Sequence, residues 1–350
     1  MSNFFVFPDT GLPLVILEAG VNHDGSLEKA RLLIDLAAQA GADHIKFQTY
    51  SAEKLAAKTS PSYWNLEEES TTSQIELFKK YDGFSLEDYK SLIDACHLKG
   101  IGFLTTCFDV DWLNLLADSL PFFKIASADI TNFVLVSAIA RKQKPILMST
   151  GAASFDEISS ALDLIRSITD AEVCLMHCVL NYPTEFENAN LGRITELKYR
   201  FPDVLIGYSD HTRPEYSHKA ISIAVSLGAQ IIEKHFTYDK DQVGNDHYHG
   251  FDLADVALLY KNLKTQFAMC KFDEENFLKI QSDARKFARR GLYAARNIAR
   301  NSIISIDDVI PLRPTLGKDG HLGSEISLVI GKRCKEEILE GEPIYKSNLE

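Results

Sequence analysis

The sequence predicts an α/β protein in which a (β/α)8 barrel of the TIM type is followed by a small β-rich domain. Three observations predict the barrel. Short apolar runs alternate with longer amphipathic stretches from residue 14 to about residue 267. The short runs are apolar throughout, which indicates strands buried on both faces of a parallel sheet. Eight such units favour a closed barrel over an open doubly wound sheet, and no glycine-rich nucleotide-binding loop follows an early strand.

The predicted strands are separated by helical patterns with recognisable ends. We expect strands at residues 14–19, 44–48, 102–105, 122–125, 146–149, 173–177, 205–208 and 231–235. A helix over 26–40 is followed by Gly41, which suits a left-handed C-cap. Another helix opens at Ser85, with Asp88 three residues later as a capping partner, and closes at Gly100. The last barrel helix is expected at 252–267, whereas the long connection 49–84 shows no strong pattern.

The pattern of residues along the sequence changes near residue 270. We assign residues 1–270 to the barrel, 271–287 to a charged helical linker, and 288–350 to a separate domain of short β segments and turns. One barrel accounts for about 250 residues. The length of 350 residues therefore leaves room for a second domain.

Composition and charge narrow the class of function. Hydrophobic residues make up 45% of the chain and charged residues 25%, as in ordinary globular proteins. The net charge of −12 argues against nucleic-acid and membrane partners. Six scattered cysteines without a CxxC pair indicate reduced thiols. The short apolar start, residues 1–8, lacks the basic region of a signal peptide, so we expect a cytoplasmic protein.

Polar side chains gather where the predicted strands end, which is where barrels of this class place their active sites. Lys46 and Lys124 could neutralise a phosphate and a carboxylate. Four hydroxyl side chains at other strand ends could donate hydrogen bonds to the same groups: Thr106, Ser127, Ser149 and Ser209. Each hydroxyl taken singly has an alternative role as the N-cap of the next helix.

Two histidines at adjacent strand ends, His211 and His235, can aim at one point. Neutral imidazoles bind Mn²⁺, Zn²⁺ or Fe²⁺ and leave positions for water and a substrate oxygen. The pair therefore predicts a metal site, with two hydrogen-bonded core histidines as the alternative. His247 and His249, on alternate residues of a loop, are kept as candidates for the same ion or for a substrate contact.

Short motifs along the whole barrel resemble those of the sialic acid synthase family, enzymes that make nine-carbon 2-keto sugars from phosphoenolpyruvate and an N-acylated six-carbon sugar. They are residues 18–25 (EAGVNHDG), 45–48 (IKFQ), 124–127 (KIAS), 149–151 (STG), 177–178 (HC), 182–184 (YPT), 207–212 (GYSDHT) and 233–237 (EKHFT). The tail, with 310–314 (IPLRP) and 329–332 (VIGK), resembles the family's antifreeze-like domain, a SAF or β-clip domain. The resemblance covers nearly the full chain. It implies an N-acetylneuraminate synthase-type transferase that acts on N-acetylmannosamine or a related 6-deoxy diacetamido sugar.

The resemblance also implies roles for single residues. His211 and His235 would hold Mn²⁺ or Mg²⁺ against the aldehyde oxygen of the sugar. Glu18 would stabilise positive charge at C2 of phosphoenolpyruvate or activate the water that adds there, and Glu233 is a further catalytic residue. The matches to the phosphoenolpyruvate pocket are Lys46, Thr106, Lys124, Ser127, Ser149 and Ser209. The matches to positions that face the sugar are Gln48, Asp129, Tyr182 and Asp246. Arg313 matches an arginine that one subunit offers to the sugar in its partner, which implies a domain-swapped homodimer.

The sequence departs from the family pattern in three places. Asp129 stands where a glutamate is usual, and Leu180 replaces a polar residue that often contacts phosphoenolpyruvate. Residues 71–77 lack the asparagine expected for N-acetylmannosamine. The acceptor sugar therefore stays open, with the precursors of legionaminate and pseudaminate as alternatives.

Two other classes of function also stay open. A Schiff-base aldolase would use Lys46, Lys124 or Lys234, because a buried lysine near other cations loses its proton more easily. A chelator should stop the metal-dependent reaction, whereas borohydride should trap substrate on the aldolase. A non-enzymatic sugar-binding or antifreeze-like module would leave the polar strand ends without a purpose.

Overall fold

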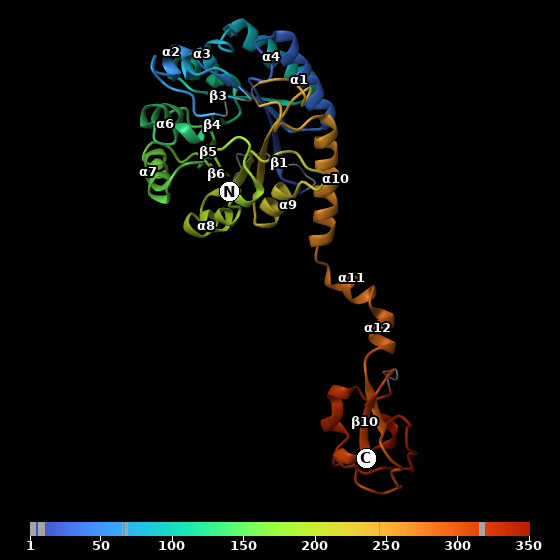
Figure 1. Ribbon diagram of the computed structural model, residues 1–350. Helices are drawn as coiled ribbons and strands as arrows, with labels where there is room; N and C mark the ends of the chain where they lie inside the picture. The colour runs from blue at the N-terminus through green and yellow to red at the C-terminus, as the bar shows by residue number, and fades with distance from the viewer. Residues whose placement is uncertain (1–4, 6–10, 65, 67–68, 245, 315–318) are drawn as a thin grey trace. The chain divides into compact units, whose positions relative to one another are not determined.

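Figure 1 shows the computed structural model, which describes residues 5, 11–64, 66, 69–244, 246–314 and 319–350. The chain divides into two compact units, Met1–Met269 and Cys270–Glu350. Apart from Phe5, the N-terminal stretch 1–8 lies outside the described residues. In the described part of the chain, no helix is long and apolar enough to cross a membrane.

Eight parallel strands form the sheet of the first unit, as the alternating pattern predicts. They are β1 (Leu14–Gly20), β2 (His44–Thr49), β3 (Gly102–Cys107), β4 (Phe123–Ile125), β5 (Ile146–Ser149), β6 (Val173–Cys178), β7 (Leu205–Asp210) and β8 (Ile231–His235). The strands follow one another in the order β3-β2-β1-β8-β7-β6-β5-β4, and the end strands β3 and β4 contact each other. The sheet is therefore a nearly closed barrel, which confirms the predicted fold class.

Helices cover the outside of the barrel (Figure 1). The longer ones are α1 (Leu27–Ala40), α4 (Leu86–Lys99), α5 (Val110–Leu116), α6 (Phe133–Ala140), α7 (Phe155–Arg166), α8 (Gly192–Arg200), α9 (Lys219–Ser226) and α10 (Leu253–Cys270). Short 3-10 helices lie at Ala117–Ser119, Ser127–Asp129 and Phe186–Asn188. Gly41 ends α1 with φ of 80°, and Gly100 ends α4 with φ of 70°. Ser85 and Asp88 form the predicted capping box of α4.

The long connection 49–84 contains structure that the sequence pattern does not indicate. It holds two short helices, α2 (Ala52–Leu55) and α3 (Gln74–Lys79), of 4 and 6 residues. Helices of this length contain too few turns for an apolar period to stand out. Ala52, Ala56 and Ile75 form a small buried cluster with Phe78 packed against it. The connection is therefore held by a hydrophobic cluster of its own.

The alternation of side chains along each strand decides which residues face the inside of the barrel. The interior cluster contains Leu14, Ile16, Leu104, Leu147, Cys174, Met176 and Ile231 from five strands, together with Phe5 and with Phe122 just before β4. On β8, Ile232 instead packs in the large cluster between sheet and helices. Gly207, at an interior position of β7, leaves room for Met176, because a Cβ there would lie 2.2 Å from the Met176 Sδ atom. On these strands, the residue two positions after the last interior residue also points inward, and it lies at the carboxyl end of the barrel.

The second unit has its own small core. It begins with α11 (Glu274–Lys279) and α12 (Ser282–Phe287), where the sequence predicts a charged helical linker, and both helices are exposed. β9 (Gly291–Ala294) and β10 (Val309–Leu312) pair antiparallel. In the described residues of this unit, a 3-10 helix lies between the two strands at Ile306–Asp308, and two more follow β10 at Gly323–Leu328 and Lys346–Asn348. Short β-bridges and a buried cluster around Leu292, Ile304 and Ile344 complete the β-rich domain.

Candidate active site

A cavity of about 580 Å³ opens where the strands of the barrel end. The predicted site residues that line it are Glu18, Lys46, Gln48, Thr106, Lys124, Ser127, Asp129, Ser149, Tyr182, Ser209, His211, Glu233, His235 and Asp246. Most of the strand residues among them stand at even spacing from an interior residue, for example Glu18 from Ile16, and Glu233 and His235 from Ile231. Arg313 belongs to the other compact unit and is exposed there, so its predicted role stays a prediction.

Two lysines and two carboxylates meet at the floor of this cavity. The Lys46 Nζ atom lies 2.5 Å from Glu18 Oε2 and 3.8 Å from Glu233 Oε2, and it donates to Thr106 Oγ1 at 3.1 Å. Lys124 Nζ lies 3.5 Å from Glu233 Oε1. Equal numbers of opposite charges offset the cost of burying them. All four charged side chains are at most 7% exposed, so their interactions are weakly screened by water.

The two carboxylates of this floor differ in their protonation. Burial raises the pKa of Glu18 and outweighs the opposing effect of Lys46, with Glu233 adding to the rise. Burial acts on Glu233 as well, but Lys124 and Lys46 outweigh it and hold its pKa below the usual range. Burial alone would lower the pKa of Lys46, but Glu18 and Glu233 keep it above its usual value. Glu233 is therefore the fixed negative charge, and Glu18 is the group suited to exchange a proton.

Hydrogen bonds orient these groups but leave part of the floor unsatisfied. Ser209 Oγ donates to Glu233 Oε1 at 3.0 Å, and Gln48 Nε2 donates to Glu18 Oε1 at 2.9 Å. Glu18 Oε2, although close to Lys46, makes no hydrogen bond of normal geometry. The buried Ser149 Oγ has no hydrogen-bond partner among the residues that the structure describes. Buried polar atoms without partners are costly, so these atoms mark a place for a polar ligand.

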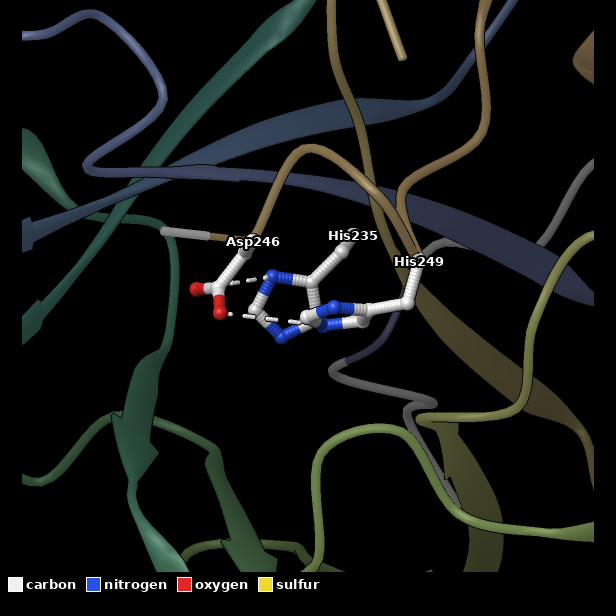
Figure 2. Close-up of side chains that lie close together, drawn as sticks. All are labelled: His235, Asp246 and His249. Atoms are coloured by element: carbon white, nitrogen blue, oxygen red, sulfur yellow. Dashed lines mark ion pairs between the residues drawn. The ribbon is translucent and has the colours of Figure 1, made fainter. Parts of the chain in front are cut away.

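Two histidines, His211 and His235, also line the cavity. His235 lies next to Asp246 and His249 (Figure 2), and the ligand atoms of these three residues all lie within 4.8 Å of one another. The His235 Nδ1 atom lies 3.3 Å from Asp246 Oδ2, and His249 Nε2 lies 3.7 Å from Asp246 Oδ1. Burial holds the pKa of His235 and of His249 well below the usual value and raises that of Asp246 to about 6. Both rings are therefore neutral, the form that binds a metal.

His211 lies next to this group. Its ring centroid is 5.3 Å from that of His235 and 4.2 Å from that of Tyr182. The Nδ1 atom of His211 lies 2.7 Å from the Val179 carbonyl oxygen, so it carries the proton and leaves Nε2 as the free acceptor. The structure thus brings the predicted pair His211 and His235 side by side, but a metal on the pair stays a prediction.

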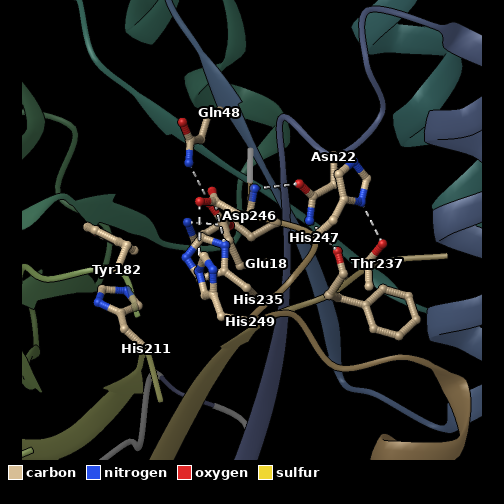
Figure 3. A network of polar contacts seen from close by, with 12 residues as sticks. Glu18, Asn22, Gln48, Tyr182, His211, His235, Thr237, Asp246, His247 and His249 are labelled. Carbon is tan, nitrogen blue, oxygen red and sulfur yellow. Dashed lines mark hydrogen bonds and ion pairs between the residues drawn. The ribbon is translucent and has the colours of Figure 1, made fainter. Parts of the chain in front are cut away.

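His247 turns away from the cavity although it is only two residues from His249. Its Nδ1 atom lies 2.7 Å from Thr237 Oγ1, and its Nε2 atom lies 3.4 Å from Asp24 Oδ1. The neighbouring Asn22 accepts from the Asp246 backbone N–H at 3.2 Å (Figure 3). His247 therefore holds the loop, whereas Asp246 lines the cavity and His249 lies directly beside His235.

Residues of the connection 49–84 also line the cavity, although in this region only Gln48, just before the connection, is among the predicted site residues. The contribution of the connection is mostly aromatic and apolar, with one carboxylate and one amide: Tyr50, Leu55, Tyr63, Trp64, Glu69, Gln74, Leu77, Phe78 and Tyr81. A signal was present, because aromatic residues are unusually dense in a stretch without strand or helix pattern. Asp129 and Leu180, the two departures outside this connection, also line the cavity. Burial raises the pKa of Asp129, which accepts a hydrogen bond from Asn132 Nδ2 at 3.0 Å.

Comparison with known proteins covers nearly the whole chain. A model of the NeuB family matches residues 33–274, and a SAF domain model matches residues 289–350. The chain is 34% identical over 332 residues to N,N'-diacetyllegionaminic acid synthase of Campylobacter jejuni, with 93% of this chain and 98% of that protein covered. It is 34% identical over 316 residues to spore coat polysaccharide biosynthesis protein SpsE of Bacillus subtilis, with coverages of 86% and 83%. A crystal structure of N-acetylneuraminic acid (sialic acid) synthetase from Leptospira borgpetersenii has a TM-score of 0.69 at 32% identity and covers 79% of this chain and 92% of that one.

Proposed function

This chain belongs to the NeuB family and carries a SAF domain, and we propose that it condenses phosphoenolpyruvate with the open-chain form of an N-acylated amino sugar. The family resemblance drawn from its motifs is thereby confirmed. Relatives with a named product are synthases of sialic, legionaminic and pseudaminic acids, which supports nonulosonic acid synthesis. The proposal of condensation with phosphoenolpyruvate rests on one observation: lysines and hydroxyl side chains line the same cavity as two histidines.

The floor suits phosphoenolpyruvate, which carries a phosphate and a carboxylate. Lys46 and Lys124 supply two positive charges, and the hydroxyls of Thr106, Ser127, Ser149 and Ser209 stand around them. The unpartnered Ser149 Oγ gives this anion a donor that no protein group uses. Glu233, together with Glu18, would keep Lys46 charged before the anion arrives.

The histidines suit a divalent ion. Neutral imidazoles with free nitrogens, together with a carboxylate, match Mn²⁺ better than Mg²⁺, which prefers oxygen ligands. His211 and His235 are the residues that we expect to hold it. When bound, such an ion supplies Lewis-acid polarisation of the sugar aldehyde.

The reaction then needs a carbon–carbon bond, a water and a leaving phosphate. Carbon 3 of phosphoenolpyruvate attacks the aldehyde carbon, whose oxygen takes a proton, and positive charge develops at carbon 2. Water adds at carbon 2 and gives its proton to Glu18, whose raised pKa suits that exchange. The new hydroxyl at carbon 2 then becomes the keto oxygen: its proton leaves with the phosphate as the carbon–oxygen bond to the phosphate breaks. Lys46, beside Glu18, would stabilise the phosphate charge throughout.

The Schiff-base alternative is less well supported by these contacts. Lys46 is held protonated by two carboxylates, which opposes nucleophilic attack by its amine. Burial outweighs Asp210 and lowers the pKa of Lys234, but its side chain lies outside the cavity and bonds to Asp210 at 2.9 Å. We expect borohydride to leave the protein unlabelled in the presence of either substrate, and a trapped lysine adduct would favour the aldolase.

The test incubates the full chain with Mn²⁺, phosphoenolpyruvate and a panel of acceptors. The panel contains N-acetylmannosamine and 6-deoxy diacetamido hexoses, with a sugar-free control. We expect phosphate release with at least one sugar and a product mass equal to both substrates plus water minus phosphoric acid. Phosphoenolpyruvate with ¹⁸O in the bridging position should yield labelled phosphate. Absence of phosphate release with every acceptor would contradict the proposal.

The predicted domain-swapped homodimer can be tested with Arg313 as the probe. We expect Arg313→Ala to raise the KM for the sugar and to leave the KM for phosphoenolpyruvate unchanged. Mixing this variant with an inactive barrel variant should restore activity only if each cavity takes its arginine from the partner. Sedimentation should give a dimer, and a monomer with full activity would contradict the exchange.

A further inference from the structure

We propose that His249 is a metal ligand and that His235, Asp246 and His249, a two-histidine, one-carboxylate set, bind the ion together with His211. The inference rests on the proposed function only in placing an ion in this cavity. It extends the predicted pair of His211 and His235 by two ligands, Asp246 and His249, which come from the loop after β8.

The first observation is the state of the His249 ring. It is fully buried, and neither of its nitrogens has a hydrogen-bond partner among the described residues. His235 Nδ1 is buried and likewise unpartnered. Leaving a buried donor or acceptor unsatisfied costs about 1–3 kcal/mol per group. His247, equally buried on the same loop, has a partner for each nitrogen, so burial on this loop does not by itself leave a ring unsatisfied.

The second observation is the distance between the rings. An ion bound to a ring nitrogen lies roughly 3.2 Å from the ring centroid, so two rings on one ion have centroids at most about 6.5 Å apart. The centroids of His235 and His249 lie 4.7 Å apart. That of His211 lies 5.3 Å from His235 and 6.4 Å from His249, so it can reach the same ion. Asp246 has one carboxylate oxygen toward each of the two proposed histidine ligands (Figure 2).

The third observation is how firmly the loop is held. The Phe251 backbone N–H donates to the His235 carbonyl at 2.7 Å, and that of Thr237 donates to the Phe251 carbonyl at 2.8 Å. Asn22 fixes the Asp246 backbone at the other end of the turn. Gly250 permits this turn, because a Cβ there would lie 3.1 Å from the Asp246 carbonyl oxygen. The loop therefore brings His249 beside His235 before any ion binds, and ligands held in place lose little entropy on binding.

The chemistry of the set determines which ion it takes. Two neutral imidazoles and a carboxylate suit Mn²⁺, Fe²⁺ or Co²⁺, with positions left for water and a substrate oxygen. Mg²⁺ binds such nitrogen-rich sites poorly. We expect the chelator-treated protein to bind Mn²⁺ at least tenfold more tightly than Mg²⁺.

The experiment measures ion binding without either substrate. Isothermal titration of the chelator-treated full chain with MnCl₂ is compared for wild type, His249→Gln and His97→Gln, a control at an exposed histidine of α4 that does not line the cavity. His249→Gln should weaken Mn²⁺ binding at least tenfold, whereas His97→Gln should change it less than threefold. Mn²⁺ should raise the melting temperature of wild type and of His97→Gln equally and that of His249→Gln less. Wild-type affinity in His249→Gln would overturn the proposal.

A spectroscopic arm covers the case in which His249→Gln does not fold. Electron spin echo measurements on Mn²⁺-loaded His211→Gln should show two coupled imidazole nitrogens, from His235 and His249. A single coupled imidazole would overturn the proposal, whatever His211 does. Because no substrate is present, failure of every sugar to react would remove the proposed function and leave this inference standing.

Discussion

Two buried lysine–carboxylate pairs in the barrel have opposite characters. Asp210 accepts from Lys234 Nζ at 2.9 Å, from the Tyr208 hydroxyl at 2.8 Å, and from the backbone N–H and hydroxyl of Thr212 at 3.0 and 3.1 Å. The pair of Lys46 with Glu18 lies in the cavity, where Glu18 Oε2 lacks a hydrogen bond of normal geometry. One pair is complete, and the other leaves bonding capacity for a ligand.

The difference follows from the alternation of side chains along two strands. Glu233 and His235 point into the cavity, while Lys234 between them is fully buried away from it and pairs with Asp210 of β7. Residue type alone does not distinguish the role of Lys234 from that of Lys46. The number of hydrogen bonds does distinguish them, because a buried network with all its bonds made stabilises a fold, whereas one with bonds missing indicates a binding site.

The largest effect that we expect comes from breaking the complete pair. Lys234→Met should lower the free energy of unfolding by about 3–5 kcal/mol, because it leaves the Asp210 charge buried without a cation. Urea denaturation of the chelator-treated protein measures this loss. A loss below 1 kcal/mol would contradict the structural role of the pair. Adding Asp210→Asn to the variant should recover part of the stability.

The stability of Lys234→Met should also depend on pH in a different way from that of the wild type. In the wild type, burial opposes ionisation of Asp210, but Lys234 outweighs it and lowers the pKa, so the pair's contribution is lost as pH falls through that pKa. Without Lys234, burial should raise the pKa of Asp210 above its value in the unfolded chain. Stability lost in Lys234→Met should then be partly regained as pH falls from 7 toward 5. Equal slopes for both proteins would contradict this account.

The same substitution in the incomplete pair should affect activity instead. Lys46→Met should lower kcat/KM about 10²–10³-fold, because a charge that stabilises the phosphate is removed. The unfolding free energy should fall by less than in Lys234→Met, since Glu18, with its raised pKa, can take up a proton when its cation is gone. Phosphate release and urea denaturation on one preparation measure both quantities. Equal destabilisation by the two substitutions would remove the contrast.

A smaller effect is expected from the unpartnered hydroxyl. Ser149→Ala should raise the KM for phosphoenolpyruvate about tenfold, since a hydrogen bond to a charged group is worth about 1.5 kcal/mol. It should leave stability nearly unchanged, because Ser149 Oγ makes no hydrogen bond within the protein. Initial rates at saturating sugar provide the measurement, and an unchanged KM would place the anion elsewhere.

The smallest effect is expected from a serine on the next helix. Ser154 accepts from the Glu157 backbone N–H and forms the capping box of α7. Ser154→Ala should cost about 1 kcal/mol of stability, the usual value of an N-cap, and leave the KM for phosphoenolpyruvate unchanged. With Ser149→Ala it gives a pair of serine substitutions with opposite phenotypes. A raised KM for phosphoenolpyruvate in Ser154→Ala would contradict the assignment of Ser154 to helix capping and of Ser149 to ligand binding.

The strand-borne half of the site could be predicted from sequence, and the loop-borne half could not. Glu18, Lys46 and Glu233 meet in one cavity because they lie near strand ends and because side chains alternate along a strand. The strand ends and this alternation can both be read from the local sequence pattern. His247 and His249 look equivalent in the sequence. They separate only because Phe251 pairs with His235 and because Thr237 and Asp24 bond to the His247 ring. Those partners are distant in the chain or depend on the turn at Gly250.

The connection 49–84 has a consequence for how this protein can change over evolution. Its helices rest on their own cluster of Ala52, Ala56, Ile75 and Phe78, while Tyr63, Trp64 and Glu69 line the cavity. Substitutions in those lining residues need not disturb the barrel core. A lineage could therefore acquire a new acceptor sugar by exchanging this one segment while the lysine floor and the histidines persist. Grafting the segment between relatives that use different sugars should transfer preference without loss of the condensation itself.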